Sequence, residues 1–324
     1  MVKNARSSSP SAPVGDPSSR SEAQMDSLPK SAGNDLIKKS LTFAHSPDPD
    51  DAYMFYGFAA GAVKIPGHEV RHHLEDIETL NERAFKGEFQ ITAVSAHAYA
   101  YLADRYWVLS CGASVGRRYG PILVARAPCT VNRFRATGHG PRTAVRIAIP
   151  GKWTTAALVL DLWLAAERQD VDRIVMPFDK ILEAVQKGVV DAGLIIHEGQ
   201  LTYQNQGLHK LWDAGEWWHI KTGLPLPLGL DVVRSDLGLP LAKEIGRALR
   251  ESILYANTHQ DKAVEYALQY GRGLGTELGK QFVSMYVNED TLTQGREVQE
   301  GLKKLYELAH RGNFIPQNPV LSFI

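Results

Sequence analysis

The feature that most constrains the fold is a regular alternation of strand-like and helix-like segments over residues 145–196. V-R-I-A-I, R-I-V-M-P and D-A-G-L-I-I are typical of short buried strands, and the two segments between them have the apolar spacing of helices. Strands separated by helices form a parallel sheet with crossover connections. The alternation therefore predicts an α/β fold.

The rest of the chain supplies a second set of elements. L-T-F-A-H near Leu41 and F-Q-I-T-A-V-S before Ala96 are typical of strands, whereas the sequence after Gly229 is mainly helical. Because the Gly- and Pro-rich stretch 127–142 and the stretch 230–234 are candidate crossings, we expect two α/β lobes. Their predicted bounds are 41–130 plus 232–324 for the larger lobe and 131–231 for the smaller.

Residues 1–40 differ in composition from the rest of the chain. They are rich in Ser, Pro, Ala and Gly, without the apolar core of a secretory signal, and predict a disordered tail on a cytoplasmic protein. Apolar runs elsewhere are far shorter than the roughly 18 residues of a membrane span, so no membrane partner is expected.

The charge balance bears on partners as well. Lys plus Arg and Asp plus Glu both number 36, and no basic stripe stands out for a phosphate backbone. Nucleic acid is therefore not expected as a partner. The sequence leaves a homodimer open as the oligomeric state.

The segment P-G-K-W-T-T-A, starting at Pro150, lies between a predicted strand and a predicted helix. Free backbone N–H groups and the hydroxyls of Thr154 and Thr155 meet there, which is typical of an anion or carbonyl site. The alternative is that Thr154 only caps the helix.

His197 directly follows the predicted strand D-A-G-L-I-I. Open α/β sheets bind ligands at the carboxyl ends of their strands, and imidazole can accept a proton near neutral pH. His197 is therefore the candidate general base, against the alternative of a structural histidine. The neighbouring Glu198 is either a second candidate base or a surface charge.

Two histidine-rich stretches raise the question of a metal. His68, His72 and His73 lie close in sequence, and His45 precedes the acidic turn that starts at Ser46, but their spacing matches no ligand pattern. No glycine-rich nucleotide motif precedes a helix either. We expect neither a metal nor another cofactor.

Eight motifs in a fixed order give the sequence a family resemblance from about Leu41 to the C-terminus. The chain resembles the 1,4-dihydroxy-6-naphthoate synthases of the futalosine route to menaquinone, whose relatives include chorismate dehydratases and solute-binding proteins. The motifs are S-P-D-P-D-D at Ser46, E-D-I-E-T-L-N at Glu75, D-R-Y at Asp104, G-R-R-Y-G-P at Gly116, P-G-K-W-T-T-A at Pro150, G-L-I-I-H-E at Gly193, T-G-L-P-L-P-L-G at Thr222 and Y-V-N at Tyr286.

The resemblance implies a two-lobed α/β fold of the type II periplasmic-binding-protein kind, with a ligand cleft between the lobes. It implies a bacterial, cofactor-free carbon–carbon lyase that converts cyclic dehypoxanthine futalosine, a small anionic molecule, to 1,4-dihydroxy-6-naphthoate and dihydroxyacetone. The family's proton acceptor corresponds to His197. Its substrate-binding positions correspond to Asp51, Ala93, Val94, Ser95, Thr154 and Thr155.

The sequence departs from the family at three positions. Asp48 and Asp50 stand where the first motif usually has Cys and Asn, and Ala93 stands where a Lys is usual. Two added acids and one lost cation would weaken binding of a carboxylate unless another cation compensates. The candidates for that cation are Arg117, Arg118 and Lys152.

These departures keep two other functions open. One is a binding protein of the same fold that closes over an amino acid, a cation or a sulfonate-like solute without reaction. The other is the related dehydration of chorismate. Closure of the two lobes over the ligand is expected in every case.

Overall fold

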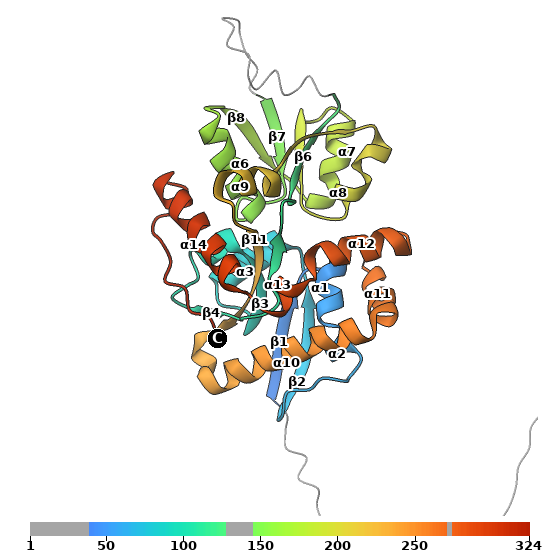
Figure 1. Ribbon diagram of the computed structural model, residues 1–324, viewed down its shortest axis with the longest axis vertical. Coiled ribbons are helices and arrows are strands. Elements are labelled where there is room, and N and C mark those ends of the chain that lie inside the picture. The colour runs from blue at the N-terminus through green and yellow to red at the C-terminus, as the bar shows by residue number, and fades with distance from the viewer. Residues whose placement is uncertain (1–38, 128–144, 271–273) are drawn as a thin grey trace, which may run out of the picture. The chain divides into compact units, whose positions relative to one another are not determined.

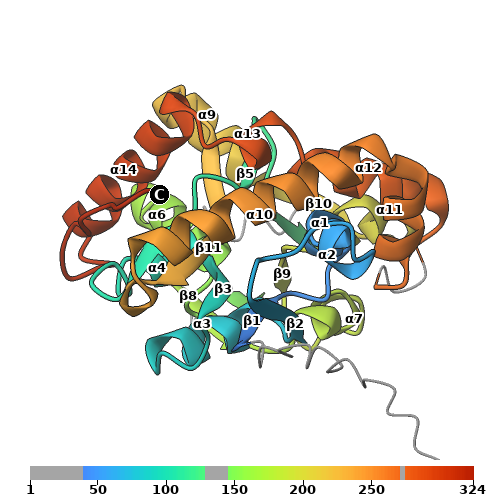
Figure 2. The same cartoon turned by 90° about the horizontal axis from the view of Figure 1, so that it is seen from below.

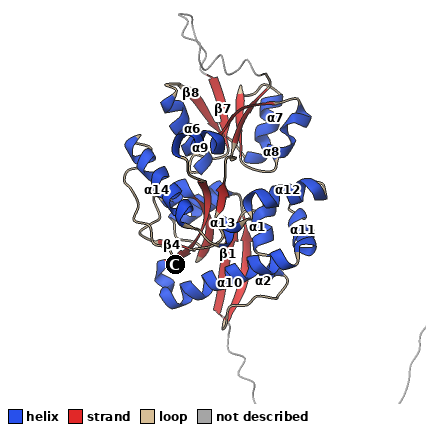
Figure 3. Cartoon of the chain, viewed as in Figure 1, coloured by secondary structure: helices blue, strands red, loops and turns tan. Residues whose placement is uncertain are grey.

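The computed structural model describes residues 39–127, 145–270 and 274–324, and within them the strands form two sheets, one of six strands and one of five. Figure 3 shows the two sheets as separate sets of strands. The strands are β1 (Lys39–His45), β2 (His68–Leu74), β3 (Ile91–Ser95), β4 (Tyr106–Val108), β5 (Ser114–Gly116), β6 (Ile122–Ala125), β7 (Val145–Ile149), β8 (Val171–Val175), β9 (Ala192–Ile195), β10 (His209–Asp213) and β11 (Leu226–Arg234).

The first sheet has the order β2-β1-β3-β11-β4, and β5 also pairs with β11. β1 is parallel to both β2 and β3, whereas β11 runs antiparallel to β3, β4 and β5. Every residue of β3 is buried, which matches its run of small and apolar side chains. β3 and β11 therefore form the centre of this sheet.

The second sheet has the order β10-β6-β9-β7-β8. β7 is parallel to β8 and β9, so the parallel sheet predicted from residues 145–196 is confirmed. β6 and β10 add to it in antiparallel orientation. Both Ile149 and Ile195 end their strands at the same edge of the sheet, which brings the segments after them together.

Helices cover both sheets. Around the second sheet, α7 contacts β6, β7 and β9, while α6 contacts α9 (Figure 1). Around the first sheet, α10 contacts α2, and α11 and α12 contact α1 (Figure 2). The helices are α1 (Pro49–Met54), α2 (Tyr56–Ala59), α3 (Ile77–Phe85), α4 (Ala96–Tyr99), α6 (Thr155–Ala166), α7 (Ile181–Gln186), α8 (Gly199–Thr202), α9 (Ala214–Thr222), α10 (Leu239–Thr258), α11 (Gln260–Leu268), α12 (Thr276–Tyr286), α13 (Glu289–Leu292) and α14 (Arg296–Arg311), with 3₁₀ turns at Phe178–Lys180, Tyr203–Gln206 and Ser235–Leu237.

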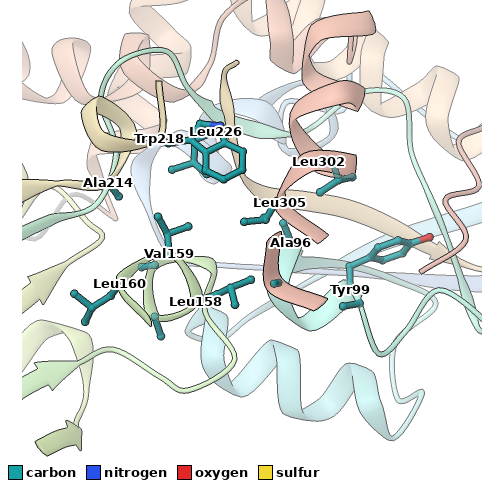
Figure 4. Packing of buried hydrophobic residues seen from close by; sticks show 14 of the residues in the cluster. Ala96, Tyr99, Leu158, Val159, Leu160, Ala214, Trp218, Leu226, Leu302 and Leu305 are labelled. Atoms are coloured by element: carbon teal, nitrogen blue, oxygen red, sulfur yellow. The ribbon is translucent and has the colours of Figure 1, made fainter. Parts of the chain in front are cut away.

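One apolar core joins helices from both sheets. Leu158 of α6 and Trp218 of α9 belong to the same buried cluster as Tyr99 of α4 and Leu305 of α14 (Figure 4). Because these side chains are fully buried, separating the helices would expose a large apolar area. None of the described helices is long and apolar enough to span a bilayer.

The chain crosses between the sheets at points that differ from the predicted bounds. β6, which we placed with 41–130, belongs to the second sheet, because it pairs with β9 and β10. The crossings therefore lie between β5 and β6 and between α9 and β11. The Gly- and Pro-rich residues 127–142, predicted as a crossing, come in sequence between β6 and β7 of the second sheet, and only Ala127 of them is among the described residues.

The second crossing and the tail also need correction. We expected the return near residues 230–234, but all of Leu226–Arg234 belongs to the first sheet, since it pairs along its length with β3, β4 and β5. The predicted tail 1–40 lies outside the described residues except Lys39 and Ser40, which begin β1.

Candidate functional site

A pocket with an empty volume of about 740 Å³, partly open to solvent, lies where the two sheets approach each other. Its walls come from the turn after β1, the ends of β3 and β9, the start of α6, the middle of β11 and the end of α12. The lining residues are Ser46, Asp48, Asp50, Asp51, Ile77, Ala93, Ser95, Gly112, Ser114, Pro121, Thr154, Thr155, Ala156, Ile196, Leu228, Gly229, Leu230, Phe282 and Tyr286.

Both threonines of the P-G-K-W-T-T segment line this pocket and are buried. Thr154 is also the N-cap of α6, since its Oγ1 accepts the Ala157 N–H at 3.2 Å. Thr155 Oγ1 donates to the carbonyl of Leu228 on β11 at 2.6 Å. Thr154 therefore both caps α6 and lines the pocket.

The anion site predicted in this segment is filled by the protein itself. The N–H of Trp153 donates to both carboxylate oxygens of Glu78, each at 3.1 Å. A Cβ on Gly151 would lie 2.2 Å from the Glu78 carboxyl carbon, so only glycine admits the side chain this closely. The expectation of free N–H groups for a ligand is wrong at Trp153.

The β3 positions divide between the pocket and the core. Ala93 and Ser95 line the pocket, but the Val94 side chain belongs to the buried core cluster. Successive side chains of a strand point to opposite faces, so residues 93 and 95 share a face that residue 94 lacks. The Val94 side chain is therefore not at the pocket.

His197 is buried, 6 % exposed, and lies next to the pocket-lining Ile196. Its Nδ1 accepts the Gly199 N–H at 3.0 Å, and its Nε2 lies 3.2 Å from the carbonyl oxygen of Phe178. These partners assign the hydrogen to Nε2 and the lone pair to Nδ1. His197 itself is not among the described residues that line the pocket.

Glu198 is buried as well, 5 % exposed, which excludes the alternative of a surface charge. Its Oε2 lies 3.6 Å from Nδ1 of His197. A carboxylate at this distance stabilises the imidazolium that forms when Nδ1 takes up a proton. The pair can therefore act as a base with a charge partner.

Three carboxyl groups of the acidic turn face the pocket. Burial raises the pKa of Asp51 to about 7, against the opposing effect of the Ser46 hydrogen bonds. Burial, followed by the charge of Asp51, raises the pKa of Asp50 well above its usual range. A raised pKa increases the protonated share of a carboxyl group near neutral pH, and the protonated form can donate a hydrogen bond.

The candidate compensating cations are not at the pocket. Arg117 is held by Asp290 at 2.6 Å and by Glu297 at 2.9 Å, and Lys152 lies over the Trp153 ring. Arg118 is absent from the lining as well, and the described lining contains neither Lys nor Arg. The pocket is therefore acidic, as the departures from the family indicate.

The histidine-rich stretches pack against each other. His45 Nε2 lies 3.1 Å from His72 Nδ1, and burial lowers the pKa of His45 to about 3. His73 contacts Glu75 at 3.1 Å. Within the described part of the chain no group of three or more His, Cys, Asp or Glu side chains is suited to a metal.

Several residues at the site were missed. Asn81 is fully buried and hydrogen-bonds to Ser95, and its position four residues after Ile77 and three before Ala84 on a helical face was an available signal. Asp231, 2 % exposed, was missed too. Its signal in the sequence was a single acid within an otherwise apolar strand. Tyr286 was noted only as part of a motif.

Comparison with known sequences gives consistent matches. A family model described as menaquinone biosynthesis matches residues 41–311. The 1,4-dihydroxy-6-naphthoate synthase of Thermus thermophilus is 36 % identical over 286 residues, 88 % of this chain and 100 % of that protein. The enzyme of the same name from Streptomyces coelicolor is 34 % identical over 280 residues, 86 % of this chain and 95 % of that protein.

Solved structures agree on the fold. A protein from Archaeoglobus fulgidus superposes with a TM-score of 0.77 at 46 % identity, covering 85 % of this chain and 98 % of that one. The periplasmic aliphatic sulphonate binding protein of Escherichia coli reaches a TM-score of 0.60 at 10 % identity, covering 87 % and 90 %. The predicted periplasmic-binding-protein fold is therefore confirmed.

Proposed function

This chain belongs to the menaquinone biosynthesis family, and on that premise we propose that it acts as a 1,4-dihydroxy-6-naphthoate synthase. The proposed reaction cleaves a carbon–carbon bond of cyclic dehypoxanthine futalosine and releases 1,4-dihydroxy-6-naphthoate and dihydroxyacetone. The enzyme needs no cofactor in this proposal. Two relatives that carry this activity in their names match over nearly the whole chain.

The observation that carries the proposal is the convergence of the proposed substrate-binding residues on one pocket. Asp51, Ser95, Thr154 and Thr155 come from three separate segments of the sequence, and all four line it. Ile196, which directly precedes the proposed base His197, also lines the pocket. Hydroxyls and carboxyls around one small volume suit a substrate that is rich in oxygen.

In the proposed mechanism, His197 accepts a proton from the substrate on Nδ1 as the carbon–carbon bond breaks, and returns it to the three-carbon fragment, which leaves as dihydroxyacetone. Nδ1 carries the lone pair, and Glu198, 3.6 Å away, stabilises the imidazolium. The Gly199 N–H occupies this lone pair in the structure, so the ring has to exchange that hydrogen bond for the substrate. A general base typically contributes a rate factor of about 10² to 10⁴.

We propose that the acidic turn binds substrate oxygens as hydrogen-bond donors. Burial raises the pKa of both side chains, that of Asp51 to about 7, so that Asp51 is about half protonated at pH 7. A protonated carboxyl donates one O–H and carries no charge that repels an anion. With the carboxyls protonated, an anionic substrate can bind although the described lining contains neither Lys nor Arg.

The test is incubation of the purified protein with cyclic dehypoxanthine futalosine, with mass spectrometry of the products. We expect naphthoate and dihydroxyacetone from the wild type and at least a hundredfold lower kcat from His197→Ala. His209→Ala, at an exposed histidine of β10, is the matched control and should retain full activity. Product at an equal rate from His197→Ala would remove His197 from the mechanism.

Parallel incubations separate the other two functions. Conversion of chorismate in place of the futalosine derivative would assign the sister dehydration. Binding of the futalosine derivative without any product would assign a binding protein. Naphthoate formation excludes both.

A further inference from the structure

Tyr286 of α12 lines the pocket, and its hydroxyl is bonded to another side chain of the protein. Its ring packs edge to face against Phe282, a second lining residue, with centroids 5.3 Å apart. The hydroxyl oxygen Oη donates to Oε1 of Gln200 at 3.0 Å. A phenol hydroxyl has a single hydrogen, so this bond uses the hydrogen and leaves the lone pairs of Oη available as acceptors.

Gln200 lies one turn after the proposed base. Its backbone N–H donates to the carbonyl oxygen of His197 at 2.9 Å, which closes a helical turn between the two residues. Residues three apart in such a turn are neighbours. The hydroxyl of Tyr286, bonded to the Gln200 amide, therefore meets the segment that carries His197.

The other end of the Gln200 amide has no partner. The side chain is 8 % exposed, and its Nε2 is shielded from solvent and makes no hydrogen bond within the described residues. A buried donor without an acceptor is destabilising. An arrangement that gives Nε2 an acceptor is therefore favoured.

Half a turn of the Gln200 amide about its last side-chain bond supplies that acceptor. Oε1 and Nε2 exchange places, so Nε2 donates to Oη of Tyr286 and the hydroxyl hydrogen is released. Without a ligand, either orientation of the amide forms one bond to the hydroxyl. With a ligand oxygen in the pocket, the rotated amide permits two bonds, one to Oη and one from Oη to the ligand. A ligand that brings an acceptor therefore selects the rotated amide.

We propose that Tyr286 is a further ligand-binding residue, whose hydroxyl donates to a carboxylate oxygen of the ligand once the Gln200 amide has rotated. Burial raises the pKa of Tyr286, so the hydroxyl keeps its hydrogen at neutral pH. A hydrogen bond to a charged acceptor is roughly twice as strong as one to a neutral acceptor, which favours a carboxylate. The inference rests on the proposed function, because the proposed product is an aromatic carboxylate.

The first test is calorimetric titration with 2-naphthoate, a probe that requires no turnover. Tyr286→Phe should weaken binding at least tenfold. Gln200→Met should weaken it less than threefold, because the hydroxyl is then free to turn to the ligand without the amide. Tyr255→Phe, at a tyrosine of α10 outside the described lining, is the matched control and should bind like the wild type.

Two outcomes of the titration would overturn the inference. Equal binding by Tyr286→Phe and the wild type would show that the hydroxyl does not contact the ligand. Equal losses in Gln200→Met and Tyr286→Phe would show that Gln200 only anchors the tyrosine.

The second test follows the Gln200 amide directly, by NMR of protein labelled with ¹⁵N at glutamine. The Gln200 signal is identified by its loss in Gln200→Met. Saturating 2-naphthoate should move the Nε2 proton downfield, because Nε2 gains an acceptor, and this shift should vanish in Tyr286→Phe. Gln204, exposed in the turn after α8, is the internal control. An unchanged Gln200 signal in the liganded wild type would overturn the rotation.

The inference and the proposed function fail in different experiments. A folded wild type that makes no naphthoate from cyclic dehypoxanthine futalosine would reject the proposed function. Tighter binding of 2-naphthoate by the wild type than by Tyr286→Phe would still support the inference in that case. A wild type that does not bind 2-naphthoate would reject the inference whether or not the enzyme is active.

Discussion

Ala93 on β3 lies directly opposite Asp231 on β11 in the antiparallel pair. Ala93 lines the pocket, while Asp231 is 2 % exposed and its Oδ2 makes no hydrogen bond within the described residues. Burial, followed by the charge of Asp51, raises the pKa of Asp231 well above its usual range. Asp231 is therefore a buried acid directly across the strand pair from a pocket-lining residue.

Ala93→Lys should place an ammonium group between Asp231 and the pocket. Since the described lining holds three aspartates and no cation, the added charge should lower KM for the anionic substrate by roughly three- to tenfold. Ala93→Met, of similar length and without charge, controls for bulk. The gain should shrink at high ionic strength; equal KM values for the Lys and Met variants would show that charge does not limit binding.

Asp231→Asn should make the protein less sensitive to alkaline pH. An unfolded aspartate ionises near pH 4, whereas the folded Asp231 keeps its proton, so wild-type stability falls as pH rises from about 4 toward the folded pKa. The loss is at most about 1.4 kcal/mol per pH unit for this group. Asp51 adds a loss of the same sign that ends near its pKa of about 7.

The measurement for Asp231→Asn is urea unfolding at pH 5 and pH 8. The variant should gain more free energy of unfolding, relative to the wild type, at pH 8 than at pH 5. Asp172→Asn, at an exposed position of β8, is the control and should shift stability equally at both values. A gain for Asp231→Asn that does not change with pH would mean that Asp231 ionises normally.

Gly112→Ala should be more destabilising than Gly207→Ala. Both glycines have a positive φ, 84° and 71°, so alanine pays about 1 kcal/mol of backbone strain at either. A Cβ at residue 112 would lie 2.1 Å from Asp231 Oδ2, whereas nothing lies within 4 Å at residue 207. We expect an extra 1–3 kcal/mol, roughly, for Gly112→Ala in urea unfolding. Equal losses would mean that Asp231 moves aside freely.

The sequence predicted those parts of the fold in which the paired strands are close to one another along the chain. The alternation over residues 145–196 was enough for β7, β8 and β9, and parallel strands end at one edge, so Thr154 and His197 were correctly expected on the same side of one sheet. The pairings of β6 and β11 were not predictable in this way. They are antiparallel additions from distant segments, and their apolar runs suit either sheet.

The candidate site shows the same division. Residue types at a strand end indicated the two threonines, and the family resemblance indicated Ser95. All three line the pocket. The carboxylate that fills the predicted anion site comes from Glu78, 75 residues earlier in the chain, and no local pattern reports such a contact. The twofold alternation of β3 could have placed the Val94 side chain in the core, but the family motif was applied to the whole tripeptide.

Tyr286→Phe should destabilise the protein through Gln200. Tyr286 Oη, on α12, donates to Gln200 Oε1, on α8, at 3.0 Å, and the Gln200 Nε2 already makes no hydrogen bond within the described residues. Removing the hydroxyl leaves the whole buried amide without a partner, which costs about 1–3 kcal/mol. Because α12 and α8 flank different sheets, this cost falls on the contact between them.

Gln200→Leu in the Tyr286→Phe background should recover most of that loss, since an apolar side chain of similar size has nothing left to satisfy. The free energy of unfolding of the wild type, both single variants and the double variant gives the coupling energy of the pair. A double variant that loses the sum of the two single losses would show that the tyrosine and the amide do not interact. A strong coupling would identify the Tyr286–Gln200 hydrogen bond as a contact that holds α12 and α8 together.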